Sequence, residues 1–179
     1  MVKKITLKEQ YEDIKKEHKN SLVLFQVGKF YEVRGLDAYI ASKILDFKII
    51  IKKISPDEGV PMCGIPIQTA VIHTKTLCDS GCRVVLIKQG KKSYEMGLRI
   101  REVEKILEPD DGAVNLNPYI DEYNIYLEEE FKPEAERIFF NPKRELKKLN
   151  LKTLDADKAL RLLREWQSKL QKKENEGGE

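Results

Sequence analysis

Five residues near the start of the chain, GKFYE (28–32), combine an aromatic ring, a carboxylate, a glycine and a lysine shortly after the apolar run LVLF (22–25). Side chains alternate along an extended chain, so Phe30 and Glu32 should point to one face and Tyr31 to the other. A group that can stack and a group that can accept a hydrogen bond would then lie side by side. On pattern alone, the stretch also fits an ordinary core strand with a solvated end.

The remaining reactive residues form no catalytic arrangement. GKKS (90–93) lacks the upstream glycine of a phosphate loop, and neither His18 nor His73 has a partner at ligand spacing. The cysteines are odd in number and lack CxxC spacing, which favours buried reduced thiols over a disulfide framework or a zinc site. They are Cys63, Cys78 and Cys82. We therefore expect a protein that is not an enzyme and that needs no cofactor or metal.

Composition places these residues in a globular protein with one main domain and an extension. The chain has 179 residues, of which 35% are charged and 41% apolar. It has no apolar run of the roughly 20 residues that span a bilayer, and its start lacks the apolar core of a signal peptide, so we expect a cytoplasmic protein. The net charge of +3 is too small to indicate nucleic acid by itself.

Helices should alternate with strands over residues 1–112, which predicts a mixed α/β domain. Thr6 and Glu9 have capping-box spacing at the start of a helix, and Gly81 follows the last residue of another. Apolar periodicity and β-branched content predict helices over 7–20, 36–47 and 67–80, and strands over 21–28, 47–54, 82–89 and 98–107. The stretch SPDEGVPMCGIP is rich in glycine and proline, so we expect a loop.

After this domain, the chain has an acidic stretch followed by a basic one. Residues 117–136 carry seven acids against one lysine, whereas residues 137–173 carry twelve basic groups against four acids. The acidic part, 113–136, is either a helix laid on the domain or a linker, and we favour a partly ordered linker. The basic extension, 137–172, contains an amphipathic helix with Asp155 as its N-cap, and 173–179 should be a frayed, disordered tail.

Several motifs in one order resemble the N-terminal mismatch-recognition domain, domain I, of MutS-family DNA mismatch repair proteins. They are the YEDIKKEH helix, the strand into GKFYE, the DA helix, the PMCGIP stretch and a strand that ends in Gln89. The resemblance covers roughly residues 8–112. It implies a MutS domain I-like mixed sheet flanked by helices, to which this chain adds a C-terminal amphipathic helix.

The resemblance also implies a role for the opening motif. In the family, the phenylalanine of F-x-E is a wedge inserted beside a mispaired or unpaired base, and the glutamate hydrogen-bonds that base; these residues match Phe30 and Glu32. Lys29 flanks the wedge, and Lys52 and Lys53 match a basic pair that would contact the DNA backbone. The expected partner is double-stranded DNA with a mismatch or distortion.

The chain also departs from the family. GIPIQTA replaces an aromatic-histidine pair, EPDDG replaces P-G-T, and the connector, lever, clamp and ATPase domains are absent from this sequence. It is either a fragment or a small stand-alone protein, and a weak likeness of the tail to the end of full MutS proteins favours the second. Two other functions remain open: a protein-interaction module that modulates mismatch repair, or a binder of branched or bent DNA.

The apolar stripe of the C-terminal helix should be buried against something. It comprises Ala156, Ala159, Leu160, Leu163, Trp166 and Leu170. The helix can fold back on its own domain or pair with the same helix of a second chain, and we expect it to form a homodimer.

Overall fold

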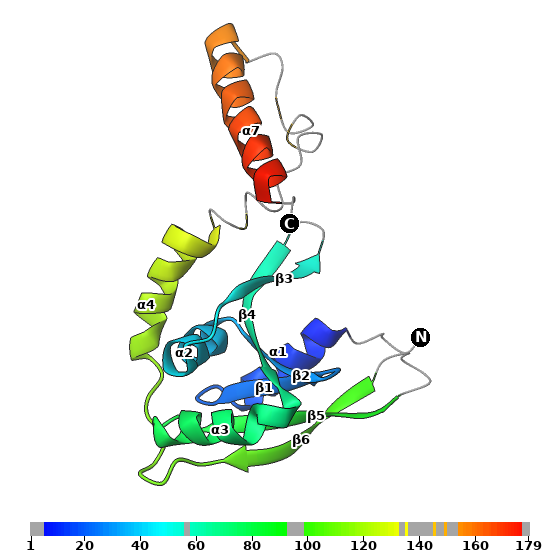
Figure 1. Cartoon of the computed structure of the whole chain (residues 1–179), viewed down its shortest axis with the longest axis vertical. Helices are drawn as coiled ribbons and strands as arrows, with labels where there is room; N and C mark the ends of the chain where they lie inside the picture. Colours follow the sequence, from blue (N-terminus) through cyan, green and yellow to red (C-terminus); the bar gives the residue numbers. More distant parts are fainter. Residues whose placement is uncertain are drawn as a thin grey trace.

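A six-stranded sheet forms the centre of the computed structural model, in the order β3-β4-β2-β1-β5-β6 (Figure 1). The structure describes residues 6–55, 58–92, 99–132 and 154–176, together with the single residues 135, 145 and 149. β1 and β5 are parallel, whereas the other neighbouring strands are antiparallel. The strands are β1 (Leu22–Val27), β2 (Phe30–Arg34), β3 (Ile50–Ser55), β4 (Glu58–Pro66), β5 (Val84–Lys92) and β6 (Arg99–Leu107). The predicted mixed α/β fold is confirmed.

Helices cover both faces of this sheet (Figure 1). They are α1 (Leu7–Glu17), α2 (Leu36–Leu45) and α3 (Ala70–Asp79), which follows the short helix η1 (Ile67–Thr69). α1 has the predicted capping box, because Thr6 accepts from the Glu9 N–H and the Glu9 carboxylate accepts from the Thr6 N–H. Gly81 follows α3 with φ +83°, a conformation that side chains with a Cβ rarely adopt.

The period of two along the strands separates two apolar clusters. α1 covers the smaller cluster, which contains Val23, Phe25, Val85 and Ile87. α2 and α3 cover the larger cluster on the opposite face, where Tyr31 and Val33 of β2 are buried. β2 therefore contributes alternate side chains to opposite faces, as the sequence pattern predicts.

The predicted loop over SPDEGVPMCGIP is wrong, because most of it forms β4. This strand lies between β3 and β2 and pairs with both of them. Pro61 lacks an N–H, yet its carbonyl accepts from the Gly35 N–H at 2.8 Å, so the proline still contributes a hydrogen bond. Met62, Cys63 and Ile65 are buried, and their burial outweighs the local turn preference of the neighbouring glycine and proline.

The acidic segment forms a helix that packs on the domain, the possibility that we did not favour. α4 (Pro118–Tyr126) continues into a single π-helical turn, η2 (Leu127–Phe131). The Tyr39 ring of α2 contacts the rings of Tyr123 and Tyr126, with centroids at 5.8 and 5.3 Å. These tyrosines supply the apolar surface that attaches an otherwise acidic helix to the domain.

The C-terminal helix, α7 (Ala156–Glu176), begins where the sequence predicts. Asp155 accepts from the Lys158 N–H at 2.7 Å, which confirms it as the N-cap. The helix continues to Glu176, so the fraying expected from residue 173 does not start there. Most of 137–153, and 177–179, lie outside the described residues. No helix in the described part of the chain is both long and apolar enough to cross a membrane.

Candidate nucleic-acid interface

A tight hairpin carries the GKFYE motif. β1 and β2 pair in antiparallel register with Val27 opposite Phe30, which leaves Gly28 and Lys29 as a two-residue turn. Gly28 has φ +60°, as the first central residue of a type II′ turn requires. The motif therefore starts in the turn and continues into a second strand, rather than ending the first one.

Two hydrogen bonds anchor this turn to its neighbours, one to strand β5 and one to the short helix η1. The Gly28 N–H donates to the side-chain oxygen of Gln89 on β5 at 3.2 Å. On the other side, the Ile67 N–H donates to the Lys29 carbonyl at 3.1 Å. Because both sides of the hairpin are attached, the residue that follows the turn has a defined position.

Phe30, the first residue of β2, projects into solvent with 49% of its surface exposed. Gly64 lies opposite Glu32 on β4, and a Cβ placed on this glycine would lie 3.6 Å from the Phe30 ring. The ring thus leans over a backbone position that has no side chain. A large apolar ring that is exposed to water and supported by a strand backbone is suited to contact a ligand.

Glu32 lies on the same face as Phe30, as predicted, but it is buried rather than exposed. Only 5% of its surface is accessible. Its Oε2 accepts from Arg34 Nη2 at 2.5 Å, and its Oε1 accepts from Lys52 Nζ at 2.8 Å. Burial by itself raises the pKa of Glu32, but hydrogen bonds from Lys52 and Arg34, together with their charges, outweigh it, and the net pKa is below the ordinary value. The carboxylate is therefore ionised at neutral pH.

We call the residues Phe30, Glu32, Arg34 and Lys52 the Phe30 face. Of the predicted contact residues, the structure brings Phe30, Glu32 and Lys52 together on it, with Lys29 in the adjoining turn. Lys53 follows Lys52 on β3, so its side chain starts from the opposite face of the sheet. Their roles in binding remain predictions.

The sequence reasoning missed Arg34, Gly64 and Gln89 as parts of this site. A signal existed for Arg34, because opposite charges two residues apart on a strand lie on one face. Gln89 had been noted only as the end of a strand. Its contact with Gly28 joins residues 61 positions apart, a distance that no local pattern reveals.

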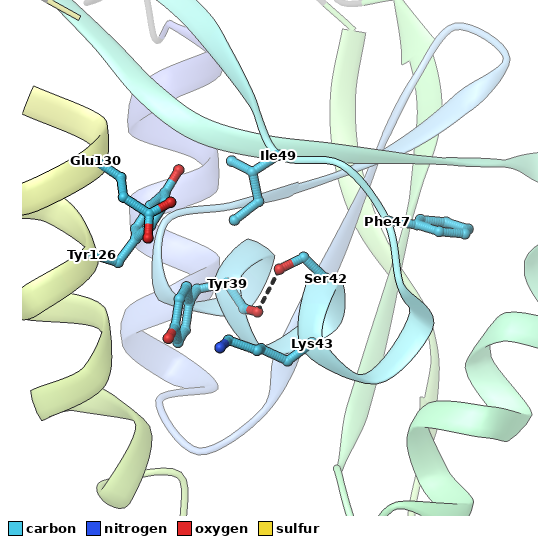
Figure 2. Close-up of a pocket in the computed structure, with 7 residues that line it drawn as sticks. All are labelled: Tyr39, Ser42, Lys43, Phe47, Ile49, Tyr126 and Glu130. Carbon is cyan, nitrogen blue, oxygen red and sulfur yellow. Dashed lines mark hydrogen bonds between the residues drawn. The ribbon is translucent and has the colours of Figure 1, made fainter. Parts of the chain in front are cut away.

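A separate pocket of about 310 Å³ lies beside α2 and η2 (Figure 2). Its lining consists of Tyr39, Ser42, Lys43, Phe47, Ile49, Tyr126 and Glu130. The Lys43 ammonium already lies 5.2 Å from the centre of the Tyr39 ring. Since α2 covers the other face of the sheet, this pocket is not part of the Phe30 face. Among the described residues, no cluster of His, Cys, Asp and Glu could hold a metal ion.

The fold and the Phe30 face define a small mixed α/β domain that presents an aromatic ring next to cations. A family model described as MutS domain I matches residues 6–111, so the chain belongs to that family. The chain is 38% identical over 104 residues to the DNA mismatch repair protein MutS of Thermodesulfovibrio yellowstonii, covering 58% of this chain and 12% of that protein. It is 34% identical over 132 residues to the protein of that name from Borreliella afzelii, covering 71% and 14%. The chain thus spans only a small part of these relatives.

Proposed function

We propose that this domain binds duplex DNA that carries a mismatched, unpaired or otherwise distorted step, and that it catalyses no reaction. The observation that best supports this function is the half-exposed ring of Phe30 on an anchored hairpin, beside a glycine. The name of the relatives, DNA mismatch repair protein, supplies the class of ligand. Mismatch repair proteins are further proposed partners.

In this proposal, Phe30 inserts from the minor groove and kinks the duplex. Insertion of an apolar ring unstacks a base step at a cost of a few kcal/mol. A mismatched step has already lost part of its stacking and pairing, so its deformation costs less. The ring therefore selects for deformability, without a preference for sequence.

Lysines supply the attraction to the backbone. Lys29 adjoins the wedge, and Lys52 has 39% of its side chain exposed at the rim of the Phe30 face. Each neutralised phosphate contributes about −0.9 to the slope of log affinity against log salt. With so few cations, we expect roughly micromolar affinity at low salt, within the range of non-specific binding.

Glu32 contributes by accepting a hydrogen bond from the displaced base. Phosphates would repel an isolated carboxylate, but Arg34 and Lys52 neutralise this one. Both carboxylate oxygens accept from cations in the free protein, and only 5% of the residue is exposed, so a base reaches Glu32 when one of these cations moves aside.

The exposed leucines of α7 favour a second copy of the chain as a further partner. Leu160 and Leu163 are 51% and 59% exposed. We propose that this helix pairs two chains, so that two Phe30 faces act in one complex.

The experiment that tests the DNA function is a titration of matched and mismatched duplexes, followed by fluorescence anisotropy. Phe30→Ala should remove the preference for the mismatch, because a stacked aromatic ring contributes roughly 1 to 3 kcal/mol. Affinity for the matched duplex should change little, since the lysines remain. Ile125→Ala is the matched control, because it also removes an exposed apolar side chain, on α4. If wild type binds both duplexes equally, or Phe30→Ala keeps the preference, the proposal is wrong.

A further inference from the structure

The two cations that hold Glu32 differ in burial and in geometry. We propose that Arg34 is a positioning residue that fixes Oε2 of Glu32, while Lys52 covers Oε1 and leaves it when DNA binds, so that Oε1 is the atom that meets the base. This inference rests on the proposed function. It identifies Arg34 as the residue that positions Glu32 and thereby determines the specificity of that site.

Both the side chain and the backbone carbonyl of Arg34 are held by neighbouring groups. Its guanidinium donates twice to Oε2, from Nη2 at 2.5 Å and from Nε at 3.2 Å, and 8% of its side chain is exposed. The same group lies 5.2 Å from the ring centre of Tyr11 and 5.6 Å from that of Phe25. The Tyr11 hydroxyl also donates to the Arg34 carbonyl at 3.2 Å. A planar guanidinium packed among aromatic rings exchanges its partners less readily than an ammonium.

Lys52 contacts the same carboxylate in a more labile way. It lies on the edge strand β3, its single contact with Oε1 is 2.8 Å long, and its side chain is 39% exposed. An ammonium on a flexible stem is strongly hydrated, and a half-exposed ion pair is weakened by solvent and salt. A DNA phosphate can therefore take Lys52 from Glu32, whereas Arg34 stays in place.

The charges permit this exchange. Arg101 of β6 also faces the cluster, with its guanidinium 5.3 Å from the ring centre of Phe25. After Lys52 moves to a phosphate, Arg34 still neutralises Glu32, and Arg101 keeps the surroundings positive. The carboxylate then stays ionised, and its free oxygen can only accept a hydrogen bond.

The DNA arm of the test compares variants by the ratio of mismatched to matched affinity. Glu32→Gln should reduce this ratio about tenfold, the size of one hydrogen bond to a charged group. Arg34→Met should reduce it as much, and Arg34→Lys should retain part of it because it keeps the charge without the fork. Lys52→Met should weaken both duplexes equally and leave the ratio unchanged. Arg161→Met, which removes an exposed charge on α7, is the control for lost charge.

A double substitution separates positioning from a general structural role. In the Glu32→Gln background, Arg34→Met should cause no further loss of the ratio, since its effect passes through the carboxylate. A ratio at the wild-type value in Arg34→Met would overturn the inference. So would a double variant in which Arg34→Met reduces the ratio as much as it does in the wild-type background. If Arg34→Met does not fold, Arg34→Lys decides: a wild-type ratio would then overturn the inference.

A measurement without DNA distinguishes this inference from the proposed function. The Glu32 carboxyl carbon, followed by NMR, should titrate below the ordinary glutamate range in wild type and at higher pH in Arg34→Lys. If the pH at which Glu32 titrates is the same in both proteins, Arg34 does not hold Glu32 and the inference fails, whatever the protein binds. If it moves but wild type shows no mismatch preference, the proposed function is wrong, and the recognition role of Oε1 falls with it.

Discussion

Glu32 shows how one residue can be both buried and charged. With 5% of its surface exposed, an isolated carboxylate would lose most of its hydration, yet Arg34 and Lys52 occupy both of its oxygens. Removing one member of a buried ion pair costs roughly 3 to 5 kcal/mol, because the other charge is left without a partner. Lys52 is 39% exposed, so solvent already weakens one of the two ion pairs, and we expect a smaller penalty here.

Glu32→Gln should lower the free energy of unfolding by about 2 kcal/mol at neutral pH. The folded pKa of Glu32 is lowered, so its contribution is fully present above the unfolded value of about 4.3 and is lost as the pH falls through the folded value. The difference between wild type and variant should therefore shrink in acid. Urea unfolding between about pH 3 and 7 measures it.

Glu129→Gln, an exposed change on η2, is the control for this series. It should alter the free energy of unfolding within about 0.5 kcal/mol across the range. A Glu32→Gln penalty that persists unchanged into acid would contradict the ionic origin of the effect.

At the scale of elements, local signals were sufficient where sequence and packing agree. The sequence correctly predicts the capping box at Thr6, the Asp155 cap and a strand over 82–89, which the structure places at 84–92. β4 was missed because glycine and proline favour turns, while its strand structure depends on pairing with two neighbours. α4 was judged a linker for a similar reason, since the Tyr39 contacts that hold it lie far away in sequence.

The same division applies to the candidate site. The alternation of β2 correctly predicted that Phe30 and Glu32 share a face. It could not predict that Glu32 is buried, because its burial depends on Arg34 packing on Phe25 and on Lys52 reaching across from β3. Tertiary contacts of this kind leave no periodic signal in the sequence.

Gln89→Ala should loosen the hairpin that carries Phe30. The Gly28 N–H loses its acceptor at 3.2 Å, at a cost of about 1 kcal/mol of stability. Amide hydrogen exchange at Gly28 should accelerate, and the preference for mismatched DNA should fall because the ring is less well fixed. NMR exchange and anisotropy measure the two effects.

Gln171→Ala on α7 is the control, because it makes the same change of side chain outside the hairpin. Alanine is favourable in a helix, so this variant should remain folded. Unchanged exchange at Gly28 in Gln89→Ala would mean that this hydrogen bond does not anchor the turn.

At the scale of the whole molecule, one domain with few cations at its proposed site should bind DNA weakly. The net charge is only +3, and Lys29 and Lys52 are the only two phosphate contacts that we propose. Linking two domains raises their effective concentration on one duplex without any new contact. A pairing element would therefore compensate for the small size of the interface.

α7 offers such an element, and its pairing is the last prediction. Leu160, Leu163 and Leu170 are 51%, 59% and 38% exposed, and burial of each large apolar side chain contributes about 1.5 to 3 kcal/mol. Two-fold symmetry would bring the same stripe of a second chain against them. Sedimentation should therefore show a dimer for wild type and a monomer for the double variant Leu160→Glu, Leu163→Glu. That variant should also bind mismatched DNA more weakly. Arg161→Glu places an acid on the same helix and should remain dimeric, whereas a monomeric wild type, or a double variant of unchanged mass, would exclude pairing through α7.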